Sequence, residues 1–212
     1  MALLVGALLL PGCWDSQARF TGSGEPVSSP DLSAQAKLLG SRELLDRPLL
    51  FRRENDLYAC GLASMDMLCR YHGVDLPEAK KQELRDLAKK KEGVSGAELK
   101  AVLESLGFEV FIFKGALDRS PTGLYHHLDR ERPVLVMTSR DGKGFHYQVL
   151  MGYDEERGNL ILYDQKRGTV LSAKPDFAKH WASANCFALL AVPKRAGETG
   201  GRTGVGSGEE KR

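Results

Sequence analysis

The hydrophobic pattern of this chain changes its period once, near residue 108, and that change constrains the fold more than any other feature. Before it, from about residue 48, apolar residues recur at steps of three and four, which is the spacing of amphipathic helices. After it, apolar and β-branched residues gather in short runs separated by turn residues, as in antiparallel strands. Helices followed by a sheet predict one α+β domain over residues 48–194, because a parallel sheet would need the two to alternate.

The first expected helix begins near Cys60. Asn55 or Asp56 can cap or precede this helix, and apolar residues follow at helical spacing. Gly73 is a natural stop, because glycine readily adopts the left-handed conformation that ends many helices.

Two more helices are expected before the sheet. One follows Pro77, which suits a first-turn position, and runs into the lysines at 89–91, whose charge favours a helix C-terminus. The other opens at Ser95, which forms a capping-box pattern with Glu98, and stops at Gly107.

The second half is expected to form an antiparallel sheet with two short helices inserted in it. The strands are expected at residues 108–113, 133–138, 146–154, 159–165, 168–173 and 186–193. The helices are expected at residues 124–128 and 175–181.

The N-terminal residues are expected to be a targeting signal. Residues 2–10 form an apolar run too short to cross a bilayer, and polar sequence follows Cys13. The segment Leu-Pro-Gly-Cys at 10–13 resembles a bacterial lipobox, so residues 1–12 are expected to be a signal peptide and Cys13 the lipid-modified residue. Pro11 and the lack of a basic residue before Arg19 depart from that pattern, and a plain secretory signal or a buried strand are the alternatives.

Two further segments lack the pattern of a packed core. Residues 13–47 are expected to be a flexible tether, because their first half is rich in Ser, Gly and Pro without a helical or strand period. Residues 195–212 have almost no apolar side chains and are expected to be disordered.

The charge balance bears on the class of partner. The 212 residues include 30 basic and 28 acidic ones, for a formal net charge of +2, so charge alone does not indicate a nucleic acid or an anionic membrane as partner. Four cysteines without a C-x-x-C pair are too few for a disulfide scaffold and do not indicate a zinc site.

Cys60 stands out because a helix N-terminus stabilises the thiolate, the reactive form of cysteine. A cysteine nucleophile needs a base, and His146 at the start of an expected strand can face the helix end. Asp164, near the end of the neighbouring strand, can lie beside His146 and fix the tautomer of its ring. The three residues predict a Cys-His-Asp catalytic triad.

Several strings in the domain resemble one enzyme family, the double-glycine leader peptidases of the papain-like clan, which mature bacteriocins. Residues 58–73, beginning YACGLASM and ending YHG, are similar to the helix that carries the family's nucleophile. Residues 146–154, HYQVLMGYD, resemble its histidine strand, and 164–168, DQKRG, its Asp-Pro-x-x-Gly segment. Phe177 and Trp181 lie where the family has a Phe and a Trp.

The resemblance covers about residues 48–193 and implies a papain-like cysteine peptidase fold, with N-terminal helices packed on a C-terminal antiparallel sheet. It also implies roles for three residues: Cys60 as the nucleophile, His146 as its base and Asp164 as the orienting residue. Standalone members behind a lipoprotein leader are familiar in this group.

The sequence departs from the family near the expected oxyanion hole. The family has a glutamine six residues before its nucleophile, and here that position is Glu54, which can donate a hydrogen bond only when protonated. Either Asn55 donates after a shift of the loop by one residue, or Glu54 is a protonated donor, or the site is weakened. Leu62 and Gln165 replace prolines that are common in the family.

These observations predict a cysteine peptidase of the cell envelope that hydrolyses a peptide bond through an acyl-enzyme intermediate. The expected partners are a peptide or protein substrate and a membrane held through a lipid anchor, with no nucleic acid and no metal or organic cofactor. Two alternatives stay open: a catalytically degenerate, lipid-anchored domain that binds a peptide or partner protein, and an acyltransferase that uses the same triad.

The other cysteines and the paired histidines have simpler interpretations. Cys69 on the apolar face of its helix and Cys186 in an apolar strand are expected to be core residues, although an oxidising compartment would permit a disulfide between them. His126 and His127 are adjacent and no carboxylate or cysteine pattern completes a metal site, so both are expected at the surface.

Overall fold

A computed structural model of the chain describes residues 32–40, 58–139, 144–165 and 167–194, and in these residues it shows the α+β fold that the change of period predicts. The helices are α2 (Cys60–Tyr71), α3 (Glu78–Lys91), α4 (Gly96–Ser105), α5 (Leu124–Asp129) and α6 (Lys174–Ala182). The strands are β1 (Lys37–Leu38), β2 (Phe108–Lys114), β3 (Val134–Thr138), β4 (His146–Asp154), β5 (Asn159–Asp164), β6 (Gly168–Ala173) and β7 (Phe187–Pro193).

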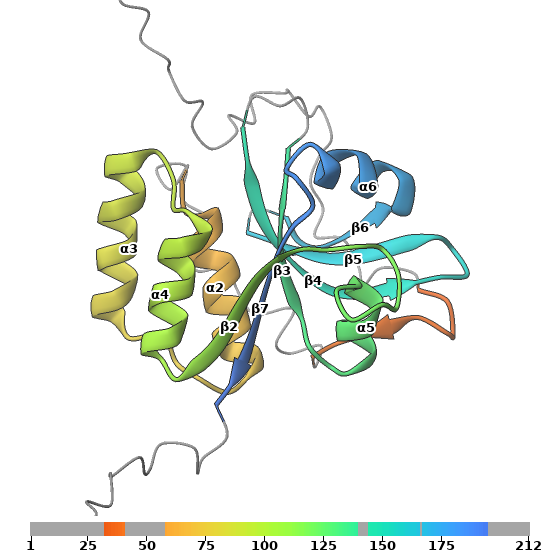
Figure 1. Cartoon of the computed structure of the whole chain (residues 1–212), viewed down its shortest axis with the longest axis horizontal. Coiled ribbons are helices and arrows are strands. Elements are labelled where there is room, and N and C mark those ends of the chain that lie inside the picture. The colour runs from red at the N-terminus through yellow and green to blue at the C-terminus, as the bar shows by residue number, and fades with distance from the viewer. Residues whose placement is uncertain (1–31, 41–57, 140–143, 166, 195–212) are drawn as a thin grey trace, which may run out of the picture.

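The described strands form one sheet, in which six follow the order β2-β7-β3-β4-β5-β6 and β1 pairs with β4 off this path; each of these pairs is antiparallel. Figure 1 shows α2, α3 and α4 grouped on one side of the molecule, with α5 and α6 on the other. The long central strand β4 pairs with both β3 and β5, and it also contacts α2. This arrangement brings the start of α2 close to β4, which carries His146, and to β5, which carries Asp164.

Helix α2 is the central helix of the fold. Every residue from Cys60 to Cys69 is buried, including the polar Ser64 and Asp66, so the helix is packed on all sides. Gly61 allows the helix to approach the sheet closely, because a Cβ atom there would lie 2.8 Å from Val94 Cγ2 and 3.2 Å from Tyr147 Cδ2. The close contact with Tyr147 places the helix start directly against the beginning of β4.

The ends of α2 and α3 differ from the prediction in detail. Ala59 caps α2, so of the two alternatives for Asn55 and Asp56, capping the helix or preceding it, only the second agrees with the structure; the Ala59 side chain provides no hydrogen bond to the helix. Pro77 is the residue just before α3 and not part of its first turn, and its ψ of 140° is that of extended backbone. The N–H groups in the first turn of α2 therefore donate no capping bond to a side chain at position 59 and can donate to other groups instead.

The capping box predicted for α4 is confirmed. Ser95 accepts a hydrogen bond from the Glu98 N–H at 3.3 Å, and the Glu98 carboxylate accepts one from the Ser95 N–H at 2.7 Å. Gly107 follows the helix with φ = +87°, a conformation that ends the helix at little cost only for glycine. These local signals fix where α4 stops and β2 begins.

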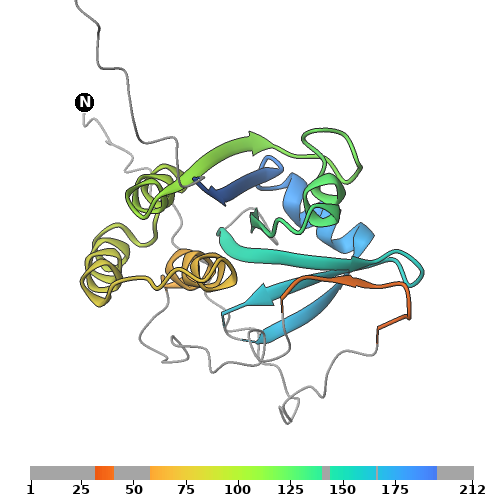
Figure 2. The ribbon, with the colours of Figure 1, turned by 90° about the horizontal axis from the view of Figure 1, so that it is seen from below.

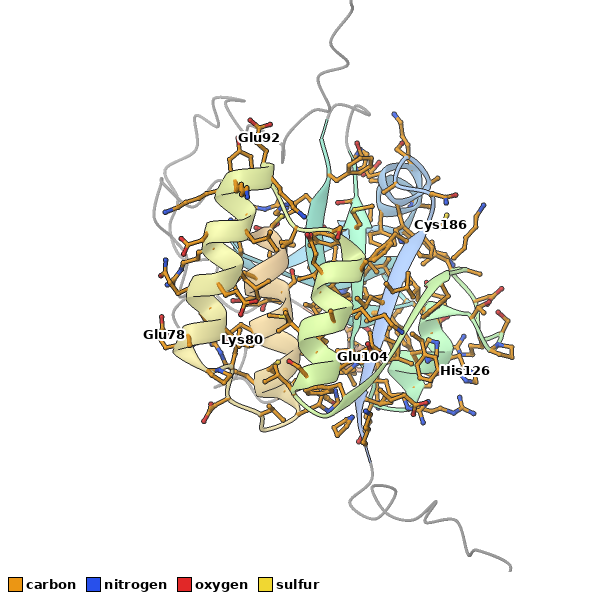
Figure 3. All side chains as sticks on the ribbon, turned by 60° about the vertical axis from the view of Figure 1, so that its left-hand side comes forward. Glu78, Lys80, Glu92, Glu104, His126 and Cys186 are labelled. Atoms are coloured by element: carbon orange, nitrogen blue, oxygen red, sulfur yellow. The ribbon has the colours of Figure 1, made fainter. Side chains whose placement is uncertain are left out.

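Helix α3 is the outermost of the three N-terminal helices. Only Leu84 and Ala88 are buried on it, and Glu78 lies on its outer side (Figure 3). The lysines at 89–91 occupy its last turn, as expected from their favourable interaction with the helix dipole.

The segment expected as a flexible tether differs from the prediction over residues 33–39. In Figure 2 it runs beside β4, where Lys37 pairs with Tyr153 and Leu38 with Gly152. Ser33 anchors the segment, because its N–H and hydroxyl donate to the two carboxylate oxygens of Asp154 at 2.8 and 2.7 Å. The packed part of the chain therefore includes residues that come before the expected start of the domain.

The remaining strands agree closely with their predicted ranges. The ranges of β4 and β6 match the prediction, while β3 and β7 each begin one residue later and β5 ends one residue earlier. No helix in the described residues combines the length and the apolar character that a membrane crossing requires.

Candidate active site

The site is built where the first residue of α2 meets the beginning of β4. Cys60 is the first residue of the helix and is 1% exposed. Its side chain forms a hydrogen bond with His146, the first residue of β4. The partial positive charge of a helix N-terminus favours a thiolate at this position, and Ala59 offers no carboxylate to cancel it.

The pairing of β4 with β5 places Asp164 beside His146. Val149 pairs with Tyr163, so Asp164 comes next along β5, toward the beginning of β4. His146 Nε2 lies 2.9 Å from Asp164 Oδ2. A carboxylate can only accept, so Nε2–H donates this bond and Nδ1 is the ring nitrogen left for the Cys60 thiol.

Asp164 accepts further hydrogen bonds besides the one from His146. Gln148 Nε2 donates to Oδ2 at 3.0 Å, and Arg167 donates its backbone N–H to Oδ1 at 3.1 Å. The Arg167 guanidinium also reaches Oδ2, at 3.3 Å. Because Asp164 is only 3% exposed, these donors compensate for the loss of water around its charge.

The electrostatics of His146 follow from these contacts. Burial opposes the charged form of the ring, but the hydrogen bonds to Asp164 and Cys60 and the negative charges of both partners outweigh that effect. Together they raise the pKa of His146 to about 10. The imidazolium is therefore the stable form at neutral pH, and it can neutralise a thiolate on Cys60.

The three predicted triad residues are thus brought together from a helix and two neighbouring strands. A thiol, an imidazole and a carboxylate in this order can deprotonate the thiol, hold the resulting imidazolium and return the proton to a leaving group. Glu54, Asn55 and the expected lipidation residue Cys13 lie outside the described residues.

Sequence reasoning missed Gln148 and Arg167. Gln148 lies two residues after His146, so strand alternation puts it on the same side of β4, and that spacing could have identified it. Arg167 follows Asp164 by three residues in the turn before β6, where a basic side chain gives no specific signal.

Cys69 and Cys186, the other two cysteines in the described residues, are not part of the triad. Cys69 is fully buried on α2, and burial together with the nearby Asp66 carboxylate raises the pKa of its thiol to about 12. Cys186 is half-buried beside the start of β7 (Figure 3). The two residues are not joined by a disulfide.

The paired histidines differ from their predicted surface position in one respect. His126 lies on the outside of α5 (Figure 3), but His127 is buried, at 6% exposure, and packs against Phe113. Burial and then the positive charges of His126, Arg132 and Arg130 lower the pKa of His127 to about 4. In the described part of the chain, no group of three or more His, Cys, Asp or Glu residues is arranged to hold a metal ion.

Comparison with solved structures shows which fold this is. The peptidase domain of Streptococcus ComA, described as a bi-functional ABC transporter involved in a quorum sensing pathway, is 22% identical, and the match covers 66% of this chain and 94% of that one with a TM-score of 0.53. Two further matches have lower TM-scores. A double glycine motif protease from an AMS/PCAT transporter, solved with its leader peptide, is 16% identical over 78% of this chain and 96% of that one, with a TM-score of 0.49. A C39-like peptidase from Bacillus anthracis is 16% identical over 64% and 89%, with a TM-score of 0.48.

The comparison by sequence is consistent with the fold. No curated protein matches the chain significantly. The profile of the Peptidase C39 family, however, matches residues 50–194, which make up more than half of the chain and include the first helix of the site and both of its strands. The helix that begins at Cys60 and the paired strands that carry His146 and Asp164 are therefore parts of a shared domain, and the chain belongs to the Peptidase C39 family of cysteine peptidases.

Proposed function

We propose that this protein is a cysteine peptidase in which Cys60 attacks the carbonyl carbon of a peptide bond. His146 takes the thiol proton and returns it to the leaving amine, and Asp164 orients the imidazole. The attack forms a C–S bond, the C–N bond then breaks, and water hydrolyses the thioester to regenerate the thiol. The observation that carries this proposal is that His146 contacts Asp164 and Cys60 at the same time.

The start of α2 supports the proposal for a second reason. A tetrahedral intermediate carries negative charge on the former carbonyl oxygen, and backbone N–H groups at a helix N-terminus are suitable donors to it. We propose that the Cys60 N–H supplies one donor and Asn55 or a protonated Glu54 the other. Loss of one such donor typically lowers turnover roughly 10²–10³-fold, so Glu54→Gln should raise activity if the second donor is missing.

The test is hydrolysis of a diverse peptide library by the full chain. We expect products from the unmodified protein and a loss of about 10⁴-fold or more for Cys60→Ser and His146→Ala. Cys186→Ser is the matched control, because that half-buried cysteine just before β7 is not one of the three triad residues and its replacement should leave hydrolysis intact. Equal activity in Cys60→Ser and in the unmodified protein would refute the proposal.

Other outcomes distinguish the alternative functions. Acyl transfer to an added amine without hydrolysis would indicate an acyltransferase that uses the same triad. Stable peptide binding that survives Cys60→Ser, with no turnover in the unmodified protein, would indicate a degenerate binding domain.

We further propose that the protein is a lipoprotein of the cell envelope, anchored through Cys13 and facing the periplasm or the exterior. Residues 10–13 support this by their resemblance to a lipobox. A lipid at Cys13 would keep the folded domain at the membrane surface, where its substrate would be a peptide or protein of the same compartment.

A further inference from the structure

Gln148 is a buried amide in the middle of a charged site. It is 5% exposed, lies on β4 two residues after His146, and is one of the few polar side chains buried in the sheet. A buried side-chain amide is costly unless its polar atoms are hydrogen-bonded. Its partners therefore show what it does in the fold.

The chemistry of those partners fixes the orientation of the amide. Asp164 can only accept, so the Gln148 NH2 group must face the carboxylate, where Nε2 lies 3.0 Å from Oδ2. Gln148 Oε1 then faces Thr138 on the adjacent strand, whose hydroxyl lies 3.4 Å away and can donate to it. The amide is thus held from β3 and directed at Asp164 on β5.

The carboxylate has two competing attractions. His146 Nε2–H and the Arg167 guanidinium both donate to Oδ2, at 2.9 and 3.3 Å, and the Arg167 side chain is 63% exposed. If the carboxylate turned toward Arg167 and solvent, its bond to the imidazole would weaken. Gln148 approaches the same oxygen from the buried side, and it carries no charge that would repel the imidazolium.

We propose that Gln148 is a positioning residue that holds Asp164 Oδ2 against His146 and thereby maintains the orientation and proton affinity of the imidazole. This role deepens the proposed function and rests on it. Gln148 acts through Asp164 and contacts no reacting atom. Thr138 supports it by fixing the direction of the amide.

The test compares Gln148→Met, which keeps the length of the side chain and removes its donor, with the unmodified full chain. The first readout is the titration of the His146 ring by NMR. We expect its midpoint to fall by about one pH unit, which corresponds to a tenfold loss of proton affinity. Thr138→Val should shift the midpoint in the same direction by less.

The second readout is alkylation of Cys60 by iodoacetamide at pH 6, resolved by mass spectrometry. A tenfold less basic imidazole shifts the balance from thiolate and imidazolium back toward thiol and imidazole, so the rate should fall by up to about tenfold in Gln148→Met. Val149→Ala is the matched control. It removes a fully buried side chain from the next position of β4 and should lower stability without moving either readout.

The outcomes separate this role from the proposed function. An unchanged or raised His146 midpoint in Gln148→Met overturns the positioning role, whatever the activity. A lower midpoint with unchanged Cys60 alkylation also overturns it, because the imidazole would then lose basicity without effect on the thiol. If Cys60 in the unmodified protein reacts no faster than an ordinary thiol, the proposed function fails and the role of Gln148 fails with it. The predicted shifts in both readouts, absent in Val149→Ala, support the role.

Discussion

Cys60 and Cys69 lie on the same helix and are equally buried, at 1% and 0% exposure, but they face groups of opposite charge. Cys60 is hydrogen-bonded to the imidazole of His146, whereas Cys69 lies near the carboxylate of Asp66. Burial alone would make both thiols inert. The charge that each cysteine faces therefore determines which one can form a thiolate.

The first prediction concerns the selectivity of alkylation. At pH 6 iodoacetamide should modify Cys60 at least a hundredfold faster than Cys69, because burial and Asp66 raise the pKa of the Cys69 thiol to about 12. Rates for each cysteine are measured by mass spectrometry of peptides from the full chain. His146→Ala should remove most of the advantage of Cys60. Equal rates for the two cysteines in the unmodified protein would contradict the assignment.

The second prediction concerns Asp164. Asp164→Asn keeps the shape of the side chain and removes its charge, so the imidazolium loses its partner and the tautomer of His146 is no longer fixed. Peptide hydrolysis should fall by roughly 10²–10⁴-fold, measured as kcat/KM. Asp176→Asn, an exposed change in the first turn of α6, is the control and should have no effect. Full activity in Asp164→Asn would show that another group orients His146.

The third prediction is a pH dependence. The pKa of His146 is raised from 6.5 to about 10, against the opposing effect of burial, by Asp164 and Cys60. A raised pKa means that the folded protein keeps the proton that the unfolded chain loses, so the stabilisation is complete below about pH 6.5 and is lost as the pH rises toward 10. In the proposed mechanism protonated His146 is also the acid that the leaving amine requires, so kcat/KM should decline near pH 10.

The same pH profile in Asp164→Asn provides the control for this assignment. Without the carboxylate, the alkaline decline should begin at a lower pH, because the imidazolium has lost a negative partner. An alkaline limb that stays in place would assign the decline to a group other than His146.

How far the sequence predicts the site depends on how local each signal is. His146 and Asp164 could be paired from the sequence, because they lie on consecutive strands and a short turn fixes which residues face each other. Gln148 was missed because its role depends on its contact with the Asp164 carboxylate. That contact is known only once the pairing of the two strands is known. The expected role of Glu54 or Asn55 in the oxyanion hole stays a prediction.

The position of the N-terminal segment could not be predicted, because it depends on contacts between residues far apart in the sequence. Ser33 and Asp154, which are hydrogen-bonded, are 121 positions apart in the sequence. Strand β1 has only two residues, too few to form an apolar pattern that would predict a strand. Its position depends on Gly152 of β4, a long-range contact that composition does not encode. By contrast, the capping box of Ser95 and Glu98 is confined to four residues and was predicted correctly.

The fourth prediction tests this docking of the N-terminal segment. In Gly152→Ala the new Cβ atom would clash with the backbone oxygen of Lys37, so β1 has to move away from β4. We expect a loss of about 1–3 kcal/mol in the free energy of unfolding, measured with denaturant. The Leu39 N–H, which donates to Met151 O, should also exchange with deuterium much faster.

Gly158→Ala is the matched control for that change. Gly158 has a positive φ, +67°, but no heavy atom lies within 4 Å of the place that an alanine Cβ would take, so the substitution adds backbone strain without a steric clash. This substitution should leave the Leu39 N–H protected from deuterium exchange. Equal loss of protection in both variants would mean that β1 is released by general destabilisation and not by the contact at Gly152.

The last prediction concerns the proposed anchor. A thioether-linked lipid at Cys13 would hold the chain on a membrane through several buried acyl groups, whereas a serine there cannot be lipidated. Cys13→Ser should therefore move the protein from the membrane fraction to the soluble fraction of a bacterial lysate, and metabolic labelling with a fatty acid should disappear. Cys186→Ser removes a cysteine of the folded domain and should change neither result. Unchanged membrane association in Cys13→Ser would refute the lipid anchor, and release without loss of labelling would place the lipid on another residue.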